Sequence, residues 1–203
     1  MEDTQISKGE RTRQVILSAA YESFLKQGYA ATSMRQIAMH AGLALGGIYN
    51  HFSGKEAIFS ELILDRHPYR QILPIIMNNP ADDPETFIRS AAQTIVDELG
   101  RRPDFIKIML IELVEFNGRN MPKIIGRVLL EVLPAIQKFR EQKGLLRKMP
   151  PLVFFRAFLG LFFSYYITEL MIAGTPAALT QKNALDHFVE IFLHGVLADK
   201  EHA

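Results

Sequence analysis

The residues most able to bind another molecule gather between Ser33 and Phe59. Tyr49 and Asn50 carry a hydroxyl and an amide that can donate hydrogen bonds to phosphate oxygens or to base edges. Lys55 stands in the first turn of a predicted helix, where a cation opposes the helix dipole unless it meets an anion that the same helix end attracts. A phosphate would satisfy both groups, so these residue types indicate a phosphate-bearing ligand.

Two short helices joined by a tight turn must position these side chains. Ile37 and Ala38 form the buried side of the first helix, and Ile48 and Phe52 face inward from the second at i, i+4 spacing. Gly42, in the turn between them, can take a positive φ without penalty. This is the helix-turn-helix layout. The outward face of its second helix carries Leu45, Gly46, Gly47, Tyr49 and Asn50.

Helical signals continue along the chain, while the alternation of polar and apolar residues that is typical of strands is almost absent. Ser7 forms a capping box with the glutamate three residues later, Gly28 ends the first helix, and Asp83 can cap a later one. The sequence predicts an all-α fold. We expect an N-terminal three-helix helix-turn-helix domain over residues 1–54 and a larger helical ligand-binding and dimerisation domain over residues 55–203.

The composition limits the class of protein. The formal net charge is +1, so any nucleic-acid site must be local and not spread over the whole surface. Cysteine is absent, which excludes disulfides and cysteine-based zinc sites. The N-terminal MEDTQISKGE has no apolar core of signal-peptide length. We therefore expect a cytoplasmic protein.

Catalytic signatures are missing from the sequence. It has no glycine-rich phosphate loop and no serine nucleophile elbow. His187 and His194 are seven residues apart on one predicted helix, which is too far for a shared metal ion without further ligands. We predict no enzyme activity, no catalytic residue, no cofactor and no metal site.

The Ser33–Phe59 segment resembles the DNA-binding domain of the tetracycline-repressor (TetR) family. The resemblance runs from Arg11 to Leu62, about the first quarter of the chain. It rests on many positions at fixed spacing, which makes it more specific than a short motif. The matching residues are Gly28, Thr32, Ile37, Ala38, Ala41, Gly42, Gly46, Tyr49, His51, Phe52 and Lys55.

The resemblance implies a transcriptional regulator that binds a double-stranded DNA operator as a homodimer, and a repressor released by a small effector, which we expect to be hydrophobic. It implies that Thr32 and Ser33 hold backbone phosphates and that Arg35 reaches the groove or a phosphate. Leu45, Gly46 and Gly47 would lie against base edges, Tyr49, Asn50 and Lys55 would contact phosphates, and His51 would pack near the backbone. The alternative is a DNA-binding protein that has no effector pocket.

Three positions depart from the family pattern. Ala44 stands where a serine or threonine usually caps the recognition helix, a cap worth about 1 kcal/mol. Leu45 and Gly47 replace residues that are usually polar. Leu45 could still touch a thymine methyl group. We expect weaker direct readout of base edges and a larger contribution from phosphates and DNA shape.

The stretch from Leu152 to Ala173 is apolar and long enough to cross a bilayer. It contains Arg156 and Glu169, each costly in lipid. A buried helix of a soluble bundle is the preferred interpretation, with a membrane-associated protein as the alternative. A helix that is apolar nearly all round needs cover on several sides, so we predict that it pairs with the final helix and their symmetry mates. The predicted dimer residues are Arg156, Gly160, Ser164, Phe188, Ile191, Phe192 and Gly195.

An effector pocket is less visible in the sequence. Aromatic residues at helical spacing can line a mostly apolar cavity that holds a few polar groups, or they can simply form core. Their abundance favours an apolar or aromatic ligand. The candidate pocket residues are Met109, Glu112, Phe116, Phe154, Phe158, Phe162, Tyr165 and Glu169. The predicted helix from Glu56 to His67 links the two domains and is expected to transmit a change between them.

Overall fold

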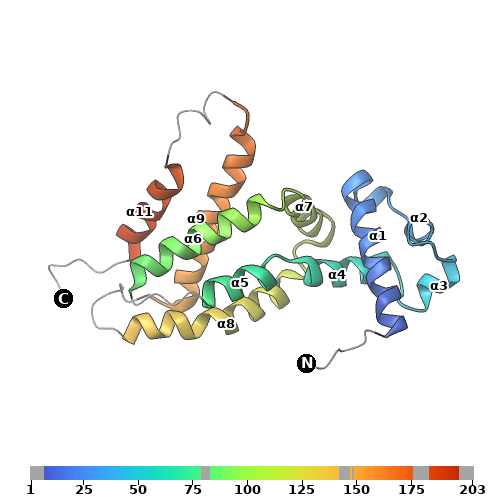
Figure 1. Ribbon diagram of the computed structural model, residues 1–203, viewed down its shortest axis with the longest axis horizontal. Helices are drawn as coiled ribbons and strands as arrows, with labels where there is room; N and C mark the ends of the chain where they lie inside the picture. Colours follow the sequence, from blue (N-terminus) through green and yellow to red (C-terminus); the bar gives the residue numbers. More distant parts are fainter. Residues whose placement is uncertain (1–6, 79–82, 142–146, 148, 176–182, 197–203) are drawn as a thin grey trace. The chain divides into compact units, whose positions relative to one another are not determined.

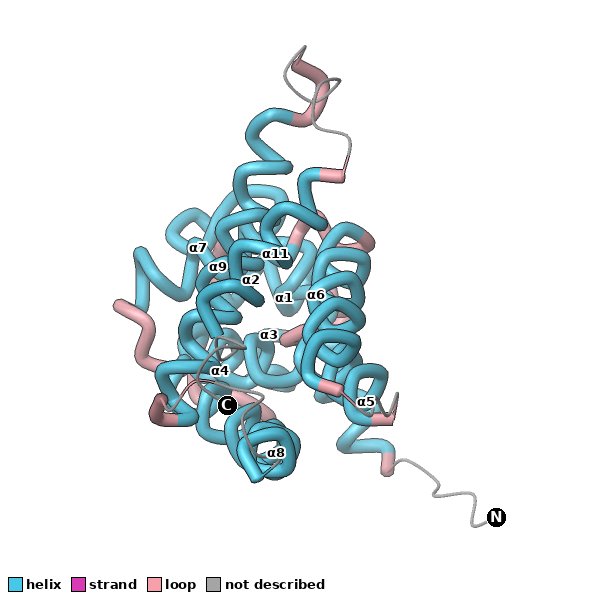
Figure 2. The backbone as a smooth tube through the Cα atoms, turned by 90° about the vertical axis from the view of Figure 1, so that its left-hand side faces the viewer, coloured by secondary structure: helices cyan, strands magenta, loops and turns pink. Residues whose placement is uncertain are grey.

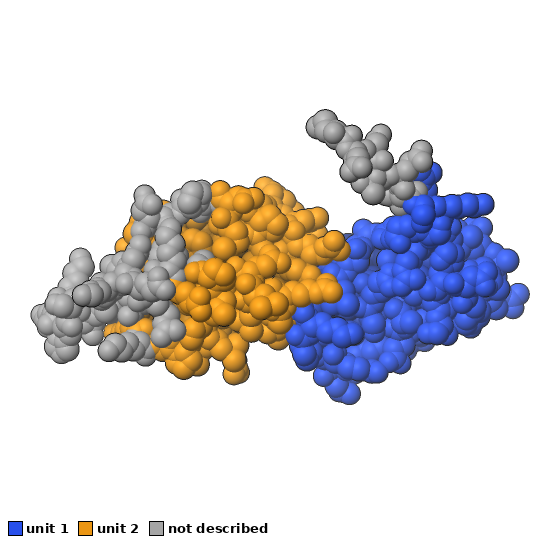
Figure 3. Space-filling model, turned by 90° about the horizontal axis from the view of Figure 1, so that it is seen from below, with its two compact units in different colours: residues 1–67, 104–124 blue, residues 68–103, 125–203 orange. Residues whose placement is uncertain are grey.

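The computed structural model describes residues 7–78, 83–141, 147, 149–175 and 183–196 (Figure 1). All regular structure within these residues is helical, which confirms the predicted all-α fold, and Figure 2 shows the helices joined by loops and turns. The chain divides into two compact units, coloured separately in Figure 3. Unit 1 comprises residues 1–67 and 104–124, and unit 2 comprises residues 68–103 and 125–203.

The predicted boundary after residue 54 does not coincide with a border of either unit. Helices α4 (Lys55–Arg66) and α7 (Phe105–Phe116) both pack against α1 (Lys8–Ala31) and therefore belong to unit 1. Helix α8 (Met121–Glu141) begins in unit 1 and continues into unit 2. Unit 1 thus includes α7, a helix that begins nearly forty residues after the end of α4 in the sequence.

Local sequence signals set the ends of the helices in unit 1. The Ser7 hydroxyl accepts the Glu10 amide at 3.1 Å at the start of α1, and Gly28 leaves helical geometry with φ of 82°. Helix α2 (Met34–His40) begins with a complete capping box, and Gly42 takes a φ of 66° before α3 (Leu45–Tyr49). These are the conformations that the sequence predicts for the helix-turn-helix.

An aromatic cluster holds unit 1 together. Phe59 of α4 stacks on Phe116 of α7, with ring centroids 4.5 Å apart and an angle of 4° between the planes. Tyr29 meets the same two rings edge-on, at 5.6 Å and 4.9 Å. Phe24 contacts both Tyr29 and Phe59. Phe116 is thus part of this core, which differs from its predicted place in an effector pocket.

Glu112 also has a structural partner in unit 1. Its side chain is fully buried, and its two carboxylate oxygens accept the backbone amide of Asn120 at 2.6 Å and the Asn120 side-chain amide at 2.8 Å. Buried carboxylates need such compensation. The pair fixes the turn between α7 and α8, so the predicted pocket role of Glu112 is replaced by a structural one.

His67 ends α4 in a half-buried position, with its ring edge-on to Phe105 at 5.1 Å. Burial disfavours the charged imidazolium and lowers the pKa of His67 from 6.5 to about 4. Between these two values the unfolded chain binds a proton that the folded chain does not bind. The folded state therefore loses stability as the pH falls through this range.

We expect the contribution of His67 to weaken the folded state by about 1–2 kcal/mol between pH 7 and pH 5. The His67→Gln variant should lose this part of the pH dependence in urea unfolding. His187→Gln, at an exposed histidine of unit 2, is the matched control and should retain it. Equal pH profiles for wild type and His67→Gln would show that His67 is not the group responsible.

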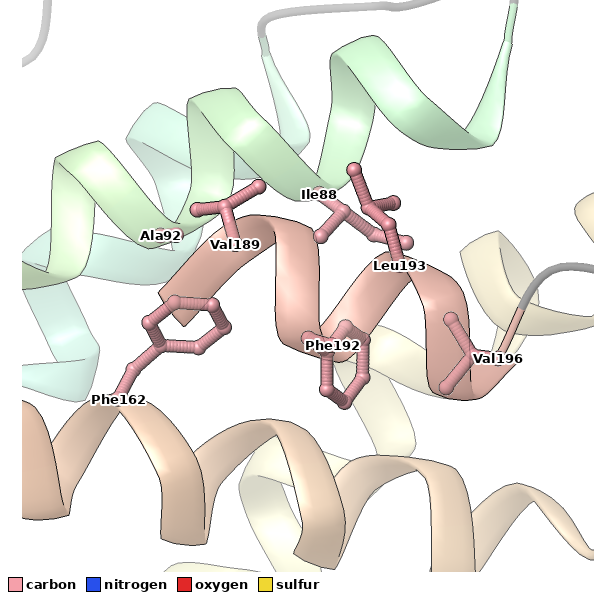
Figure 4. Close-up of a cluster of buried hydrophobic side chains, with 7 residues drawn as sticks. All are labelled: Ile88, Ala92, Phe162, Val189, Phe192, Leu193 and Val196. Carbon is pink, nitrogen blue, oxygen red and sulfur yellow. The ribbon is translucent and has the colours of Figure 1, made fainter. Parts of the chain in front are cut away.

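Unit 2 contains α5 (Tyr69–Met77), α6 (Pro84–Gly100), α9 (Pro151–Ile172), α11 (Ala184–Val196) and most of α8. Helix α6 begins as predicted, with the Asp83 side chain accepting the Thr86 amide at 2.8 Å. Helices α6, α9 and α11 enclose the core of this unit. Figure 4 shows Val189 and Leu193 of α11 on the side of α6, and Phe192 on the side of α9.

The core of unit 2 corrects one prediction and bears on another. Phe192 is only 5% exposed, and its ring centroid lies 5.4 Å from those of Phe154 and Phe158 and 6.0 Å from that of Phe162. Phe192 is therefore a core residue of the protomer and is not available to a partner. The rings of Phe154, Phe158 and Phe162 all contact the Phe192 ring, so these three residues take part in the core, one of the two roles that the sequence leaves open for them.

Helix α9 buries only one side within the protomer. Its buried residues are Phe155, Phe162, Tyr165 and Tyr166, so it is less enclosed than a helix inside a soluble bundle. It is the one helix among the described residues that could cross a membrane by length and composition. A single helix of this kind is weak evidence for a membrane span, and Arg156 and Glu169 within it oppose one.

Candidate nucleic-acid interface

The helix-turn-helix has a firmly packed inner side. Ile37 and Ile48 are fully buried and Phe52 is 3% exposed, so both helices are anchored to the core of unit 1. The turn is closed by the Leu43 amide, which donates to the Ala38 carbonyl at 2.9 Å. This packing fixes which side of α3 faces outward.

The outward side of α3 carries the residues that the sequence predicts. Leu45 is 42% exposed and Tyr49 is 51% exposed, Gly46 and Asn50 are exposed, and Gly47 is half-buried. No side chain caps the start of α3, because the methyl group of Ala44 cannot accept a hydrogen bond. The Ala44 carbonyl accepts the amides of Gly47 and Ile48, which begins the helix through the backbone alone.

Ser33 and Arg35 lie at the start of α2. Ser33 is the N-cap, and its hydroxyl and amide are both 2.8 Å from Oε1 of Gln36. Arg35 is exposed, two residues after the cap. Both residues are on the surface and can approach a phosphate, although the Ser33 hydroxyl is already part of the capping box.

Thr32 has an internal role that the sequence does not reveal. Its side chain is 2% exposed, and its hydroxyl donates to the Gly28 carbonyl at 2.8 Å and accepts the Gln27 amide at 3.1 Å. The hydroxyl is therefore committed to closing the end of α1. The resemblance implies that Thr32 holds a backbone phosphate, but its hydroxyl is used within the protomer.

Lys55 also turns inward. Its ammonium group donates to the carbonyls of Tyr29 at 2.6 Å and Thr32 at 2.7 Å, and it lies 4.1 Å from the centroid of the Tyr29 ring. Burial lowers the pKa of Lys55, and the charge of Glu115 opposes this shift. The carbonyls of the turn after Gly28 thus supply the negative charge that a phosphate was predicted to supply. Lys55 joins the start of α4 to the end of α1.

Arg13 is a positioning residue that the sequence analysis missed. Its guanidinium forms a two-pronged ion pair with Glu61 of α4, and its Nη1 donates to the His51 carbonyl at 2.9 Å. It also lies 4.3 Å from the centroid of the Phe52 ring. One side chain of α1 thus holds the segment that follows α3. His51 takes part through its backbone, which agrees with a structural position.

We expect Arg13→Met to reduce DNA affinity and to lower the free energy of unfolding by about 1–3 kcal/mol, because it leaves Glu61 and the His51 carbonyl without this donor. Urea unfolding and titration of operator DNA measure the two effects. Arg11→Met, at an exposed position of the same helix, is the matched control. Equal losses in the two variants would mean that Arg13 contributes only general positive charge.

The fold and this surface define a helix-turn-helix protein of a class that binds DNA. The sequence matches the family "Bacterial regulatory proteins, tetR family" over residues 16–62. It is 25% identical to the HTH-type transcriptional regulator YvkB of Bacillus subtilis over 193 residues, which are 93% of this chain and 98% of that protein. It is 31% identical to YdgC of the same organism over 136 residues, covering 65% of this chain and 69% of that one.

The crystal structure of a TetR-family transcriptional regulator from Mesorhizobium loti has the same fold. The TM-score is 0.74 at 23% sequence identity, and the match covers 95% of this chain and all of that one. The chain belongs to the TetR family. It is a DNA-binding transcriptional regulator, as the resemblance implies, and its family and relatives are regulators rather than enzymes.

Proposed function

We propose that this cytoplasmic regulator is a repressor that binds an operator as a homodimer and releases it when a small, mostly apolar effector binds in unit 2. The observation that carries the proposal is the outward side of α3, which is exposed while its inner side is fixed by Ile48 and Phe52. A recognition helix that enters a major groove needs a packed inner side and an exposed outer side.

The DNA contacts divide into two groups. Leu45, Gly46 and Gly47 face base edges at the start of α3, while Tyr49 and Asn50 at its other end contact phosphates. Ser33 and Arg35 of α2 contact the backbone of the DNA beside them. Thr32, His51 and Lys55 support this surface from within, through the bonds described above.

A second copy of the chain covers the outer side of α9. Arg156, Gly160 and Ser164 are exposed on this side, together with Val153 at 51% and Met171 at 76% exposure. A soluble protein needs cover for such an apolar stripe. Ile191 and Gly195 of α11 are exposed as well and extend the interface, with half-buried Phe188 at its edge. Two-fold symmetry then presents two recognition helices, which must be about 34–36 Å apart to enter successive major grooves.

The effector site lies in unit 2, near the tyrosines of α9. The Tyr166 hydroxyl is buried and has no hydrogen-bond partner among the described residues, and burial raises its pKa. A buried hydroxyl without a partner is unfavourable, so a ligand with one acceptor in an apolar frame would stabilise it. Tyr165 and Glu169 are neighbours along the same helix. Met109 belongs to unit 1.

The test begins with selection of DNA bound by the full-length protein from a random pool, followed by screening of compounds for release. An enriched palindromic sequence, bound by two chains and released by an apolar compound, is the expected result. Failure to enrich any sequence would refute operator binding. Enrichment without release by any compound would instead support the alternative of a ligand-independent DNA-binding protein.

The Tyr166 assignment has its own measurement. The compound that releases the operator should raise the melting temperature of the wild type more than that of Tyr166→Phe. Both proteins should bind the operator equally when the compound is absent. Equal thermal shifts would place the effector elsewhere.

A further inference from the structure

The start of α3 offers DNA almost no hydrogen-bonding side chain. Positions 44 to 47 are occupied by alanine, leucine and two glycines. Bidentate recognition of guanine or adenine needs arginine, lysine, asparagine or glutamine, and recognition of cytosine is made by acidic residues. The polar groups of Tyr49 and Asn50 come only at the other end of the helix. Side chains of these types can contact bases only through shape and apolar contact.

The two glycines are not required by the fold of the chain. Neither Gly46 nor Gly47 has a positive φ, and a Cβ atom added at either would meet no heavy atom within 4 Å. Glycine inside a helix costs up to about 1 kcal/mol relative to alanine. The protomer thus gains nothing from them in packing or backbone geometry. What they provide is space on the outer side of α3, where another surface can approach the backbone.

Leu45 is the one side chain that projects into this space from the first turn. It is 42% exposed, so it is accessible to another surface. The major groove contains a single apolar group on the unmodified bases, the C5-methyl of thymine. With no polar side chain beside it, a leucine that lies against base edges distinguishes thymine from cytosine by this methyl group.

We infer that Leu45 reads a thymine methyl in each half-site, and that Gly46 and Gly47 allow the close approach that this contact needs. The inference rests on the proposed binding of α3 in the major groove and adds the chemical group that is recognised. It assigns to Leu45 a specificity that does not depend on hydrogen bonds.

The test uses an operator obtained by selection, in which each thymine is replaced in turn by deoxyuridine, which lacks only the methyl group. One symmetric position should lose about fourfold in affinity per half-site, the effect expected for one buried methyl. Replacing that thymine by 5-methylcytosine, paired with guanine, should bind better than cytosine at the same position. Equal binding of all the deoxyuridine operators would overturn the inference.

The protein variants identify the side chain responsible. Leu45→Ala should bind the thymine and deoxyuridine operators within about twofold of each other, because the methyl partner is gone. Met39→Ala is the matched control, since Met39 is 67% exposed on α2 and should keep the discrimination. Thermal unfolding verifies that both variants are folded, and the deoxyuridine series on the wild type decides the question even where Leu45→Ala does not fold.

The outcomes separate this inference from the proposed function. If no sequence is enriched, operator binding fails, and the inference fails with it. If a sequence is enriched and bound tightly but no thymine methyl contributes, operator binding stands and only the inference is refuted. Retained discrimination in Leu45→Ala would move the methyl contact to another residue.

Discussion

Truncating Phe116 to alanine is expected to lower the free energy of unfolding of unit 1 by about 3–5 kcal/mol. The Phe116 ring is 4% exposed, stacks on Phe59 at 4.5 Å and meets Tyr29 at 4.9 Å. Its removal leaves a cavity between α1, α4 and α7 that these rings cannot close. Urea unfolding monitored by circular dichroism measures the loss, and operator affinity should fall with it at 37 °C.

The same helix supplies the control. Leu113 is 52% exposed, so Leu113→Ala removes a side chain of similar character from the surface and should cost less than about 1 kcal/mol. Phe116→Leu retains most of the volume and should lie between the two. If Phe116→Ala and Leu113→Ala destabilise the protein equally, α7 is not part of the DNA-binding core.

A piece of the chain that stops at residue 67 contains the whole helix-turn-helix but leaves Phe59 and Tyr29 without the Phe116 ring. It also lacks Arg119, which pairs with Glu56 at the start of α4. The DNA-binding part of this regulator is thus built from two separate stretches of sequence.

The helices of unit 1 could be predicted because their signals are local. Ser7 and Glu10 are three residues apart, Gly28 interrupts the helical geometry of α1 near its end, and Gly42 lies in the turn that it forms. Each of these features depends on neighbours within one or two turns. The pattern that identified the family is of the same kind, since it lies within a single continuous segment.

The roles of Thr32 and Lys55 could not be predicted in this way. Their exposed or buried state depends on carbonyl groups that only the folded chain brings near them, such as the Tyr29 carbonyl that accepts from Lys55 across 26 positions. Arg13 is a stronger case, because its partner Glu61 is 48 positions away. A polar residue beside a DNA-binding motif has two possible uses, in the interface or behind it. The sequence pattern alone does not separate them.

For the aromatic residues of unit 2, the sequence predicts which side of the helix they share but not what that side contacts. Helical spacing placed Phe154, Phe158 and Phe162 on one side of α9, and that placement is correct. Spacing could not reveal that the side faces Phe192 rather than a cavity. Gly160, a predicted dimer residue, lies on a different side of α9, and this side is exposed in the protomer.

Introducing arginine at Gly160 is expected to convert the dimer to a monomer and to weaken operator binding by about a hundredfold or more. Gly160 lies in the middle of the exposed side of α9, one turn from Arg156. In a two-fold interface the new charge would be desolvated and would face positive charges from both chains. A monomer then holds one half-site at a time and loses the gain in affinity that comes from linking two, which reaches about a hundredfold to ten-thousandfold.

The chain offers a close control for this experiment. Gly126 of α8 is also an exposed helical glycine, and at both positions an added Cβ would meet no heavy atom within 4 Å. Gly126→Arg therefore adds the same charge to the protomer without strain and should leave the dimer and its operator affinity intact. Light scattering at micromolar concentration measures the mass, and titration of the selected operator measures the affinity. A Gly160→Arg protein that remains dimeric would exclude the outer side of α9 from the interface, and a monomer with full operator affinity would show that a single recognition helix suffices for binding.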